Sequence, residues 1–148
     1  MLLRISDKIL AGFLYSKIIS APAYLNFDVQ VLSGEMITGI SEHSLIEIVG
    51  VLVDNAIEAC TKERNTISIV LDGQDDKIAF SIKNPVENLT LTQISHFFER
   101  GYTTKANREG HGLGLFQANQ LVKKYEGELT VELLEDTPFE QICFRVEV

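Results

Sequence analysis

The feature that most constrains the fold is the stretch of residues 45–60, LIEIVGVLVDNAIEAC. Its apolar residues recur at helical spacing over about four turns, which predicts one largely buried helix. Ser41 can cap this helix, and Ser44 with Glu47 has the form of a capping box one turn later. Asn55 interrupts the apolar face, where an unpaired buried amide costs on the order of 1–3 kcal/mol. This amide is therefore a core group bonded to backbone, a residue near the end of a surface helix, or a ligand.

The length and charge of the chain narrow the classes of function. The 148 residues suit one domain with a substantial core, and the content of 45% hydrophobic and 23% charged residues is ordinary for a globular protein. The net charge of −8 argues against nucleic acid or an anionic membrane as the main partner. Any anionic ligand therefore requires a local cluster of hydrogen-bond donors.

The cysteines, the histidines and the N-terminal segment carry little functional signal. Cys60 and Cys143 lie far apart without metal-ligand spacing, which favours free intracellular thiols. No run of about 18 apolar residues occurs, so no spanning helix is predicted. Asp7 and Lys8 break the apolar part of the first residues, which we interpret as a helix or as a joint to something upstream rather than a signal peptide.

The remaining patterns predict helices and strands in mixed order. Residues 6–19 suit an amphipathic helix, and residues 27–32 alternate as a half-buried strand. One side of the helix would carry Ile9, Leu10, Phe13, Leu14 and Ile18, and one face of the strand Phe27, Val29 and Val31. The other expected elements are strands at 66–71 and 77–83 around a turn at 72–76, a short helix within 90–98 capped by Thr90 or Thr92, a helix at 112–125 with Gly127 as its C-cap, and a hairpin of 129–134 with 141–148. We expect Asn84 and Pro85 to end the second of these strands.

These elements indicate an α+β fold. It would be a two-layer α/β sandwich, with a mixed, mostly antiparallel sheet and helices on one face.

A second informative stretch is residues 101–115, GYTTKANREGHGLGL. Its glycines alternate just where a helix should begin, so backbone N–H groups can approach an anion at a helix N-terminus. The same stretch supplies positive charge and hydroxyl donors, which a phosphate chain needs in an acidic domain. The residues concerned are Thr103, Thr104, Lys105, Arg108, Gly110, Gly112 and Gly114. The spacing matches neither a P-loop nor a dinucleotide fingerprint, and a flexible glycine-rich surface loop is the alternative.

Together the two stretches carry a resemblance. VLVDNAIEAC resembles the N box, HFFERGYTTK the F box with the lid, and GHGLGL the second glycine box of the ATP-binding fold of histidine kinases, gyrase and MutL, the GHKL superfamily. The resemblance covers about residues 27–148 and implies a Bergerat-type ATP-binding fold. More narrowly, GVLVDNAIEA, GYTTK and GHGLGL resemble the AgrC-like peptide-pheromone kinases of quorum sensing.

The resemblance implies a role for each matching residue. Asn55 would ligate Mg²⁺ through its amide oxygen, with the ion bridging nucleotide phosphates. Lys105 would pair with a phosphate when a lid of residues 99–110 closes, and Phe97 with Phe98 would anchor that lid or pack in the core. The nucleotide-binding residues would be Asn55, Asn84, Thr103, Thr104, Lys105, Arg108, Gly110, His111, Gly112, Leu113 and Gly114. No residue is assigned a certain catalytic role.

Three departures from the family pattern qualify these roles. Where other members carry an Asp-x-Gly-x-Gly box for the adenine amine, this chain has Asn84 followed by Pro85, and we take Asn84 as the acceptor. Where the ATP-hydrolysing relatives place a general-base Glu, this chain has Val51, which cannot take a proton. Three residues after Asn55, many kinases have a basic residue, whereas here there is Glu58.

The resemblance implies a protein-histidine kinase that uses ATP and Mg²⁺. Residues 1–148 would form one catalytic and ATP-binding domain, with 1–24 as an N-terminal helix or the joint to a missing domain. The γ-phosphoryl group would pass to a histidine on an upstream helical dimerisation domain, and then to a response regulator. The full-length protein would be a membrane-attached homodimer with this domain in the cytosol. The alternatives are a nucleotide-binding regulator or degenerate kinase that acts by protein contact, a gyrase- or MutL-type ATPase, and an α+β domain without ligand.

Overall fold

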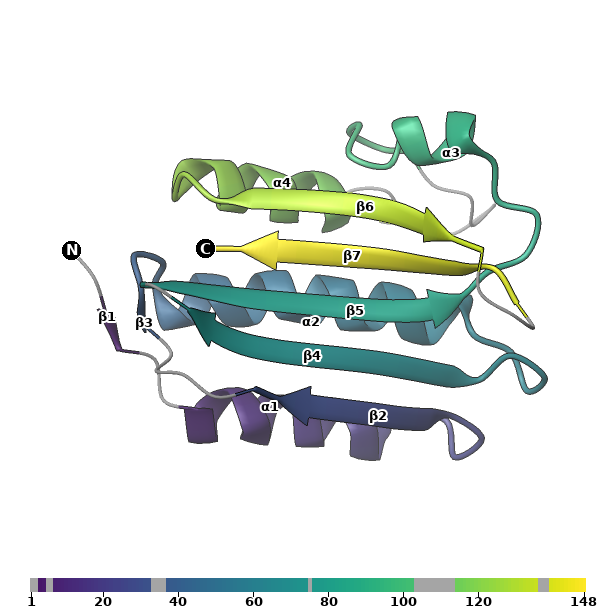
Figure 1. Ribbon diagram of the computed structural model, residues 1–148, viewed down its shortest axis with the longest axis horizontal. Helices are drawn as coiled ribbons and strands as arrows, with labels where there is room; N and C mark the ends of the chain where they lie inside the picture. Colours follow the sequence, from purple (N-terminus) through teal and green to yellow (C-terminus); the bar gives the residue numbers. More distant parts are fainter. Residues whose placement is uncertain (1–2, 5–6, 33–36, 75, 103–113, 136–138) are drawn as a thin grey trace.

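The computed structural model describes residues 3–4, 7–32, 37–74, 76–102, 114–135 and 139–148 (Figure 1). Within these ranges the chain forms helices and strands that alternate irregularly along the sequence. They are β1 (Leu3–Arg4), α1 (Asp7–Ser20), β2 (Asn26–Val31), β3 (Ile37–Thr38), α2 (Glu42–Ala59), β4 (Thr66–Gln74), β5 (Lys77–Pro85), α3 (Leu91–Ser95), α4 (Gly114–Lys124), β6 (Glu128–Leu134) and β7 (Gln141–Glu147).

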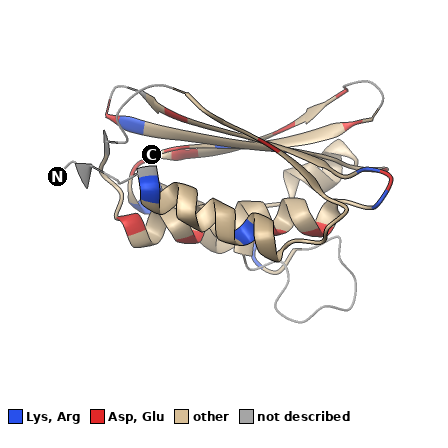
Figure 2. Cartoon of the chain, turned by 90° about the horizontal axis from the view of Figure 1, so that it is seen from below, with Lys and Arg blue, Asp and Glu red and all other residues tan. Residues whose placement is uncertain are grey.

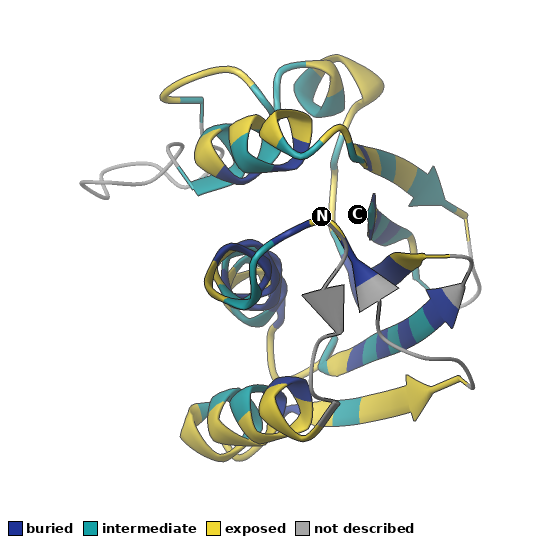
Figure 3. Ribbon diagram, turned by 90° about the vertical axis from the view of Figure 1, so that its left-hand side faces the viewer, coloured by how far each residue is buried: buried dark blue, intermediate teal, exposed yellow. Residues whose placement is uncertain are grey.

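The main sheet has five strands in the order β2-β4-β5-β7-β6. The β2–β4 pair is parallel, and the other three pairs are antiparallel. Helices α1, α2 and α4 all lie on one face of this sheet, as the end-on view in Figure 3 shows. The predicted two-layer α+β architecture is therefore confirmed.

Helix α2 lies at the centre of the helical layer, and most of its apolar side chains are buried. It packs on the helix-facing side of β5, where Ile78, Phe80 and Ile82 are at most 1% exposed. Full burial of one such side chain contributes roughly 1.5–3 kcal/mol relative to exposure. The core therefore fixes the rotation of α2 about its own axis, and with it the direction in which Asn55 points.

The cap predicted for α2 is confirmed only in part. Ser41 is the N-cap, and its Oγ accepts a hydrogen bond from Ser44 N at 3.2 Å. The capping box that we predicted from Ser44 and Glu47 is wrong, because Ser44 lies inside the helix and its Oγ is 3.4 Å from the hydroxyl of Tyr125. A capping box does occur at α3, where Thr90 and Gln93 bond reciprocally.

The predicted burial of the N-terminal elements is partly wrong. Val29 and Val31 are 39% and 57% exposed, because β2 is an edge strand that pairs only with β4. In α1, Leu10 and Leu14 are buried as expected, whereas Ile9 is 42% exposed. Alternation in the sequence identified the strand, but its position at the edge of the sheet decides how much of it is covered.

Asn84 and Pro85 end the strand, as expected, but they do so as its last two residues, because β5 runs to Pro85. The β4–β5 pairing stops at Lys83, opposite Ser68, whereas β5 continues against β7 as far as Pro85. The last two residues of β5 thus have a neighbouring strand on one side only. A proline is tolerated there because no partner on the open side requires its missing N–H.

Contrary to our prediction, helix α4 does not end with Gly127 as its cap. Glu126 has the left-handed φ of 59°, whereas Gly127 donates its N–H to Val122 O at 2.9 Å. These bonds form a Schellman-type ending with Glu126 at the left-handed position. Gly127 is required for another reason: a Cβ there would lie 2.5 Å from Glu147 O and 2.6 Å from Val148 Cγ1.

Replacing Gly127 with alanine should therefore destabilise the domain by roughly 1–3 kcal/mol, as overpacking against backbone typically does. Gly12→Ala is the matched control, since a Cβ at this position in α1 meets nothing within 4 Å and should be neutral or stabilising by up to about 1 kcal/mol. Urea unfolding of the two variants measures both effects. Equal stability of Gly127→Ala and the wild type would contradict this account of the turn.

Both cysteines are free, as expected from the sequence. Cys60 is the buried C-cap residue of α2, and desolvation raises the pKa of its thiol to about 11. Burial also raises the pKa of the Cys143 thiol, helped by the nearby charge of Glu132. Neither thiol is thus a reactive thiolate near neutral pH.

Candidate functional site

Three of the predicted site residues lie in described elements. Asn55 is on α2, Asn84 is on β5, and Gly114 is the first residue of α4. The C-terminal ends of α2 and β5 lie toward the same end of the molecule in Figure 1. The other predicted site residues lie outside the described residues: Thr103, Thr104, Lys105, Arg108, Gly110, His111, Gly112 and Leu113.

Asn55 lies half-buried in the second half of α2, and its amide nitrogen is buried. On the same side of the helix, Leu52 is fully buried and Glu58 is exposed. The amide is therefore at the boundary between the core and the surface. The preceding residue, Asp54, is exposed and pairs with Lys17 of α1 at 2.8 Å, which ties α1 to this part of α2.

Gly114 brings the start of α4 against α2 close to Asn55. A Cβ at Gly114 would lie 3.2 Å from Cγ1 of Val51, so a larger residue would require the Val51 side chain to shift by a few tenths of an ångström. Val51 is one helical turn before Asn55, or about 6 Å along the axis. The helix that follows the glycine-rich stretch therefore begins beside the amide that the sequence predicts as a ligand.

Asn84 is almost completely buried, with 2% of its surface exposed. Alternate residues of β5 face the helices, and Asn84 shares that face with Phe80 and Ile82. Its Nδ2 donates a hydrogen bond to Pro85 O at 3.1 Å, which sets the orientation of the amide. A polar side chain held in one orientation on the core face of a strand can provide directional recognition.

Aromatic residues anchor the segment that leads out of α3. The rings of Phe97 and Phe98 both pack on Phe144 of β7, with centroid separations of 6.1 and 6.5 Å. Tyr102 packs against Phe97 and His96, at 6.1 and 5.5 Å. Both phenylalanines thus attach this segment to the sheet, and Tyr102 packs within the same aromatic group.

Charges of both signs are scattered over the helices and strands in Figure 2. Among the described residues, no group of three or more His, Cys, Asp or Glu side chains could hold a metal ion by itself.

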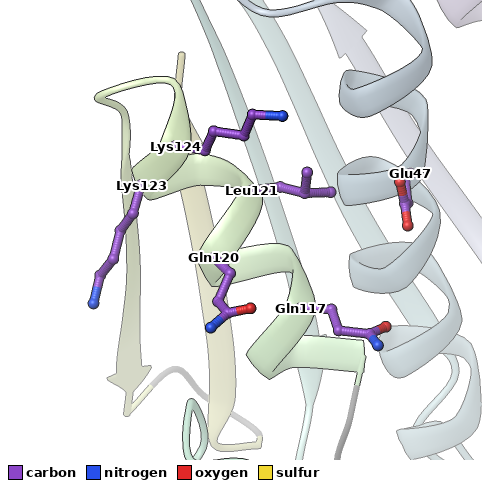
Figure 4. A pocket seen from close by; sticks show the side chains of 6 residues that line it. All are labelled: Glu47, Gln117, Gln120, Leu121, Lys123 and Lys124. Atoms are coloured by element: carbon purple, nitrogen blue, oxygen red, sulfur yellow. The ribbon is translucent and has the colours of Figure 1, made fainter.

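A groove lies between α2 and α4 (Figure 4). It is lined by Glu47, Gln117, Gln120, Leu121, Lys123 and Lys124. Glu47 is two helical turns before Asn55, or about 12 Å along the axis. The lining of the groove begins about one helical turn from Val51 on α2 and about one turn from Gly114 on α4, and it does not include Asn55.

Comparison with known families identifies the class of this domain. The profile of the GHKL domain family matches residues 41–144, which includes α2, β5 and α4. The chain therefore belongs to the GHKL domain family.

Curated relatives narrow the identification. A probable C4-dicarboxylate sensor kinase of Halalkalibacterium halodurans is 31% identical over 97 residues, which are 64% of this chain and 18% of that protein. The sensor histidine kinase CitA of Klebsiella pneumoniae is 28% identical over 85% of this chain and 24% of its own length. DcuS of Escherichia coli K12 is 29% identical over 87% of this chain and 24% of its own length. The chain thus spans less than a quarter of the length of these relatives.

Solved structures of histidine kinases share the fold. The mycobacterial sensor histidine kinase MprB superposes with a TM-score of 0.81 at 17% identity, covering 100% of this chain and 97% of that one. The nucleotide-free catalytic domain of the histidine kinase ThkA gives a TM-score of 0.78 at 19% identity, covering 100% and 93%. The domain has the fold of the catalytic domain of sensor histidine kinases. None of the helices in the described ranges is long and apolar enough to cross a membrane.

Proposed function

We propose that this domain binds Mg-ATP and transfers the γ-phosphoryl group to a histidine on a separate helical domain. The observation that carries the proposal is the close approach of Gly114 to Val51, one turn from Asn55, where an added Cβ would lie 3.2 Å from Cγ1 of the valine. It brings the start of α4, where helix N–H groups favour an anion, next to an amide that can share a cation with that anion. Membership of the GHKL family supports the same reading.

Asn55 suits Mg²⁺ as a ligand. Mg²⁺ prefers oxygen donors and is usually held by one or two protein oxygens together with substrate phosphates and water. An amide oxygen at the boundary of the core fits that donor set, and the described residues offer no complete protein cage. When bound, the ion would neutralise charge on the phosphates. In this proposal Thr103, Thr104, Lys105, Arg108, Gly110, His111, Gly112 and Leu113 bind the phosphates together with Gly114.

Asn84 is the proposed contact to the adenine base. Because its Nδ2 is bonded to Pro85 O, the oxygen of the amide is directed the other way, where it can accept from an amine. The side chain faces the helical layer from the end of β5, toward the same end of the molecule as Asn55. Asn84 would thus take the role of the aspartate in other family members.

The remaining steps need partners. The proposed phosphoryl acceptor is a histidine in an upstream dimerisation domain, and the next acceptor is a response regulator. We propose that residues 1–148 form one catalytic domain whose first 24 residues join it to that upstream domain. The complete protein would be a membrane-attached homodimer with this domain in the cytosol.

The signal sensed by the complete protein has two candidates. The motifs GVLVDNAIEA and GYTTK favour a pheromone receptor of the AgrC-like group, which would serve quorum sensing. The names of the relatives favour a sensor of C4-dicarboxylates, as for the Halalkalibacterium halodurans kinase. A degenerate kinase that binds nucleotide and acts by protein contact is a second function, which Asn84 in place of the usual aspartate favours.

Nucleotide binding tests the first part of the proposal. Isothermal titration should detect ATP and ADP in the presence of Mg²⁺, and excess EDTA should weaken the binding of both by tenfold or more. The physical reason is that the ion compensates phosphate charge in a domain of net charge −8. Binding that is absent, or unaffected by EDTA, would contradict the proposed Mg-nucleotide site.

A further inference from the structure

The side chain of Arg64 joins separate segments of chain beside the end of β5. One guanidinium nitrogen is 3.0 Å from a carboxylate oxygen of Glu87 and 3.5 Å from Val86 O. The guanidinium carbon also lies 4.6 Å from the ring centre of Phe139, near the start of β7. Nothing in the sequence pattern singled out this arginine, because its partners come from two distant parts of the chain.

The backbone of Arg64 belongs to a hydrogen-bonded turn just after α2. Thr61 N donates to Arg64 O at 3.0 Å, and Arg64 N donates to Thr61 Oγ1 at 3.2 Å. This turn follows directly after Cys60, the C-cap of the helix that carries Asn55. The side chain of Arg64 therefore starts four residues after the C-cap of α2 and reaches the residues that follow β5.

Arg64 contacts the two residues that directly follow Pro85, whose carbonyl orients Asn84. Val86 N donates to Glu140 O at 3.0 Å, and Arg64 holds the carbonyl of the same residue and the side chain of the next. The acceptor for the Asn84 amide, Pro85 O, lies directly before these two residues. The peptide group that carries Pro85 O is thus fixed by the bond of Val86 N to Glu140 O, and Arg64 holds the next carbonyl and side chain along the chain.

We propose that Arg64 is a positioning residue that keeps the oxygen of the Asn84 amide toward the base and so selects adenine over guanine. This inference rests on the proposed function. Adenine presents an amine where guanine presents a carbonyl oxygen, and an Asn side chain carries both an acceptor and a donor. Only one orientation of the amide suits adenine, and a flipped amide would donate to guanine instead.

Arginine suits this role better than lysine. The ion pair with Glu87 is partly exposed, with 29% of the Arg64 and 59% of the Glu87 side chain accessible, so it contributes little by itself. A planar guanidinium can stack on Phe139 while its N–H groups bond to Val86 and Glu87. A lysine side chain cannot do both. Arg64→Lys should therefore lose part of the base preference despite keeping the charge.

The test is a double-mutant cycle read as the ratio of ATP to GTP affinity, measured by isothermal titration with Mg²⁺. Arg64→Met should lower this ratio by about tenfold, mainly through tighter GTP binding. Asn84→Asp should keep the preference for ATP, since a carboxylate has no donor face to present. In the Asn84→Asp background, Arg64→Met should then leave the ratio unchanged, because no amide remains to flip.

Arg145→Met is the matched control. Arg145 also pairs with a glutamate, Glu147 at 2.8 Å, but both lie in β7 and join no separate segments. The Arg145→Met variant should leave the ratio of ATP to GTP affinity unchanged. An unchanged ratio in Arg64→Met, or an equal fall in the Asn84→Asp background, would overturn the positioning role. If Arg64→Met does not fold, Arg64→Lys and Phe139→Leu provide the same comparison. A wild type that binds neither nucleotide would instead refute the proposed function.

Discussion

Asn55→Ala should lower the affinity for Mg-ATP by about tenfold to a hundredfold while the domain stays folded, because losing a contact to a charged group is worth roughly 1.5–3 kcal/mol. Asn55 is half-buried on α2, one turn from where Val51 approaches the start of α4. An amide at that place can bind a cation that phosphates also bind. The effect should disappear when titrations are done without Mg²⁺, since the lost contact acts through the ion.

Two further variants make the measurement specific. Asp54→Ala changes the neighbouring residue, whose carboxylate pairs with Lys17 on the surface, and should keep the wild-type affinity. Asn55→Asp retains an oxygen donor and should bind more tightly than the alanine variant. Circular dichroism and thermal unfolding establish that each variant is folded. Equal affinity of wild type and Asn55→Ala would refute the assignment of Asn55 as a ligand.

Most of the fold could be predicted because the local periodicity of apolar residues and the helix caps determine where its helices and strands lie. The apolar spacing of residues 45–60 predicted α2, and the observed helix, Glu42–Ala59, begins after Ser41 as its cap requires. Thr90 likewise marked the start of α3. The β-branched residues of 66–71 and the alternation in 77–83 predicted the β4–β5 hairpin; β4 runs three residues further into the turn, and β5 two residues further at its other end. These signals depend on neighbours in sequence, which is why they can be read without coordinates.

What could not be predicted depends on neighbours in space. Alternation in β2 could not reveal that Val31 lies on an edge strand and is 57% exposed. The role of Gly127 follows from the approach of Glu147 O, which is distant in sequence. The same holds for the candidate site: sequence motifs identified Asn55 and Gly114 separately, but only the packing of α4 on α2 brings Gly114 against Val51. The contacts of Arg64 are likewise visible only in the structure.

The isolated domain should hydrolyse ATP very slowly, yet phosphorylate a histidine-bearing helical domain of a sensor kinase that is supplied in trans. A general base that activates water is worth roughly 10²–10⁴-fold in rate. At the position where ATP-hydrolysing relatives carry that base, this chain has Val51, whose side chain packs toward Gly114. An aliphatic side chain there can neither orient nor deprotonate water.

The nearest carboxylates do not obviously replace the missing base. Glu47 lines the groove between α2 and α4, about 12 Å along the helix from Asn55. Asp54, directly before Asn55, pairs with Lys17. Glu58 lies three residues after Asn55, on the exposed side of the last turn of α2, and is the acid that we select for the test. Because a histidine nucleophile brings its own lone pair, phosphoryl transfer to it does not require the base that water requires.

Radiolabelled ATP with and without the helical domain separates these cases. We expect label on the helical domain, little free phosphate from the catalytic domain alone, and the same slow hydrolysis in Glu58→Ala. Asn55→Ala should remove the transfer of label, which ties the reaction to the nucleotide site. Fast hydrolysis by the isolated domain would overturn the kinase proposal in favour of an ATPase if Glu58→Ala abolished it. A carboxylate on α2 would then act as the general base that Val51 cannot provide. Nucleotide binding without either reaction would instead favour the degenerate kinase that acts by protein contact.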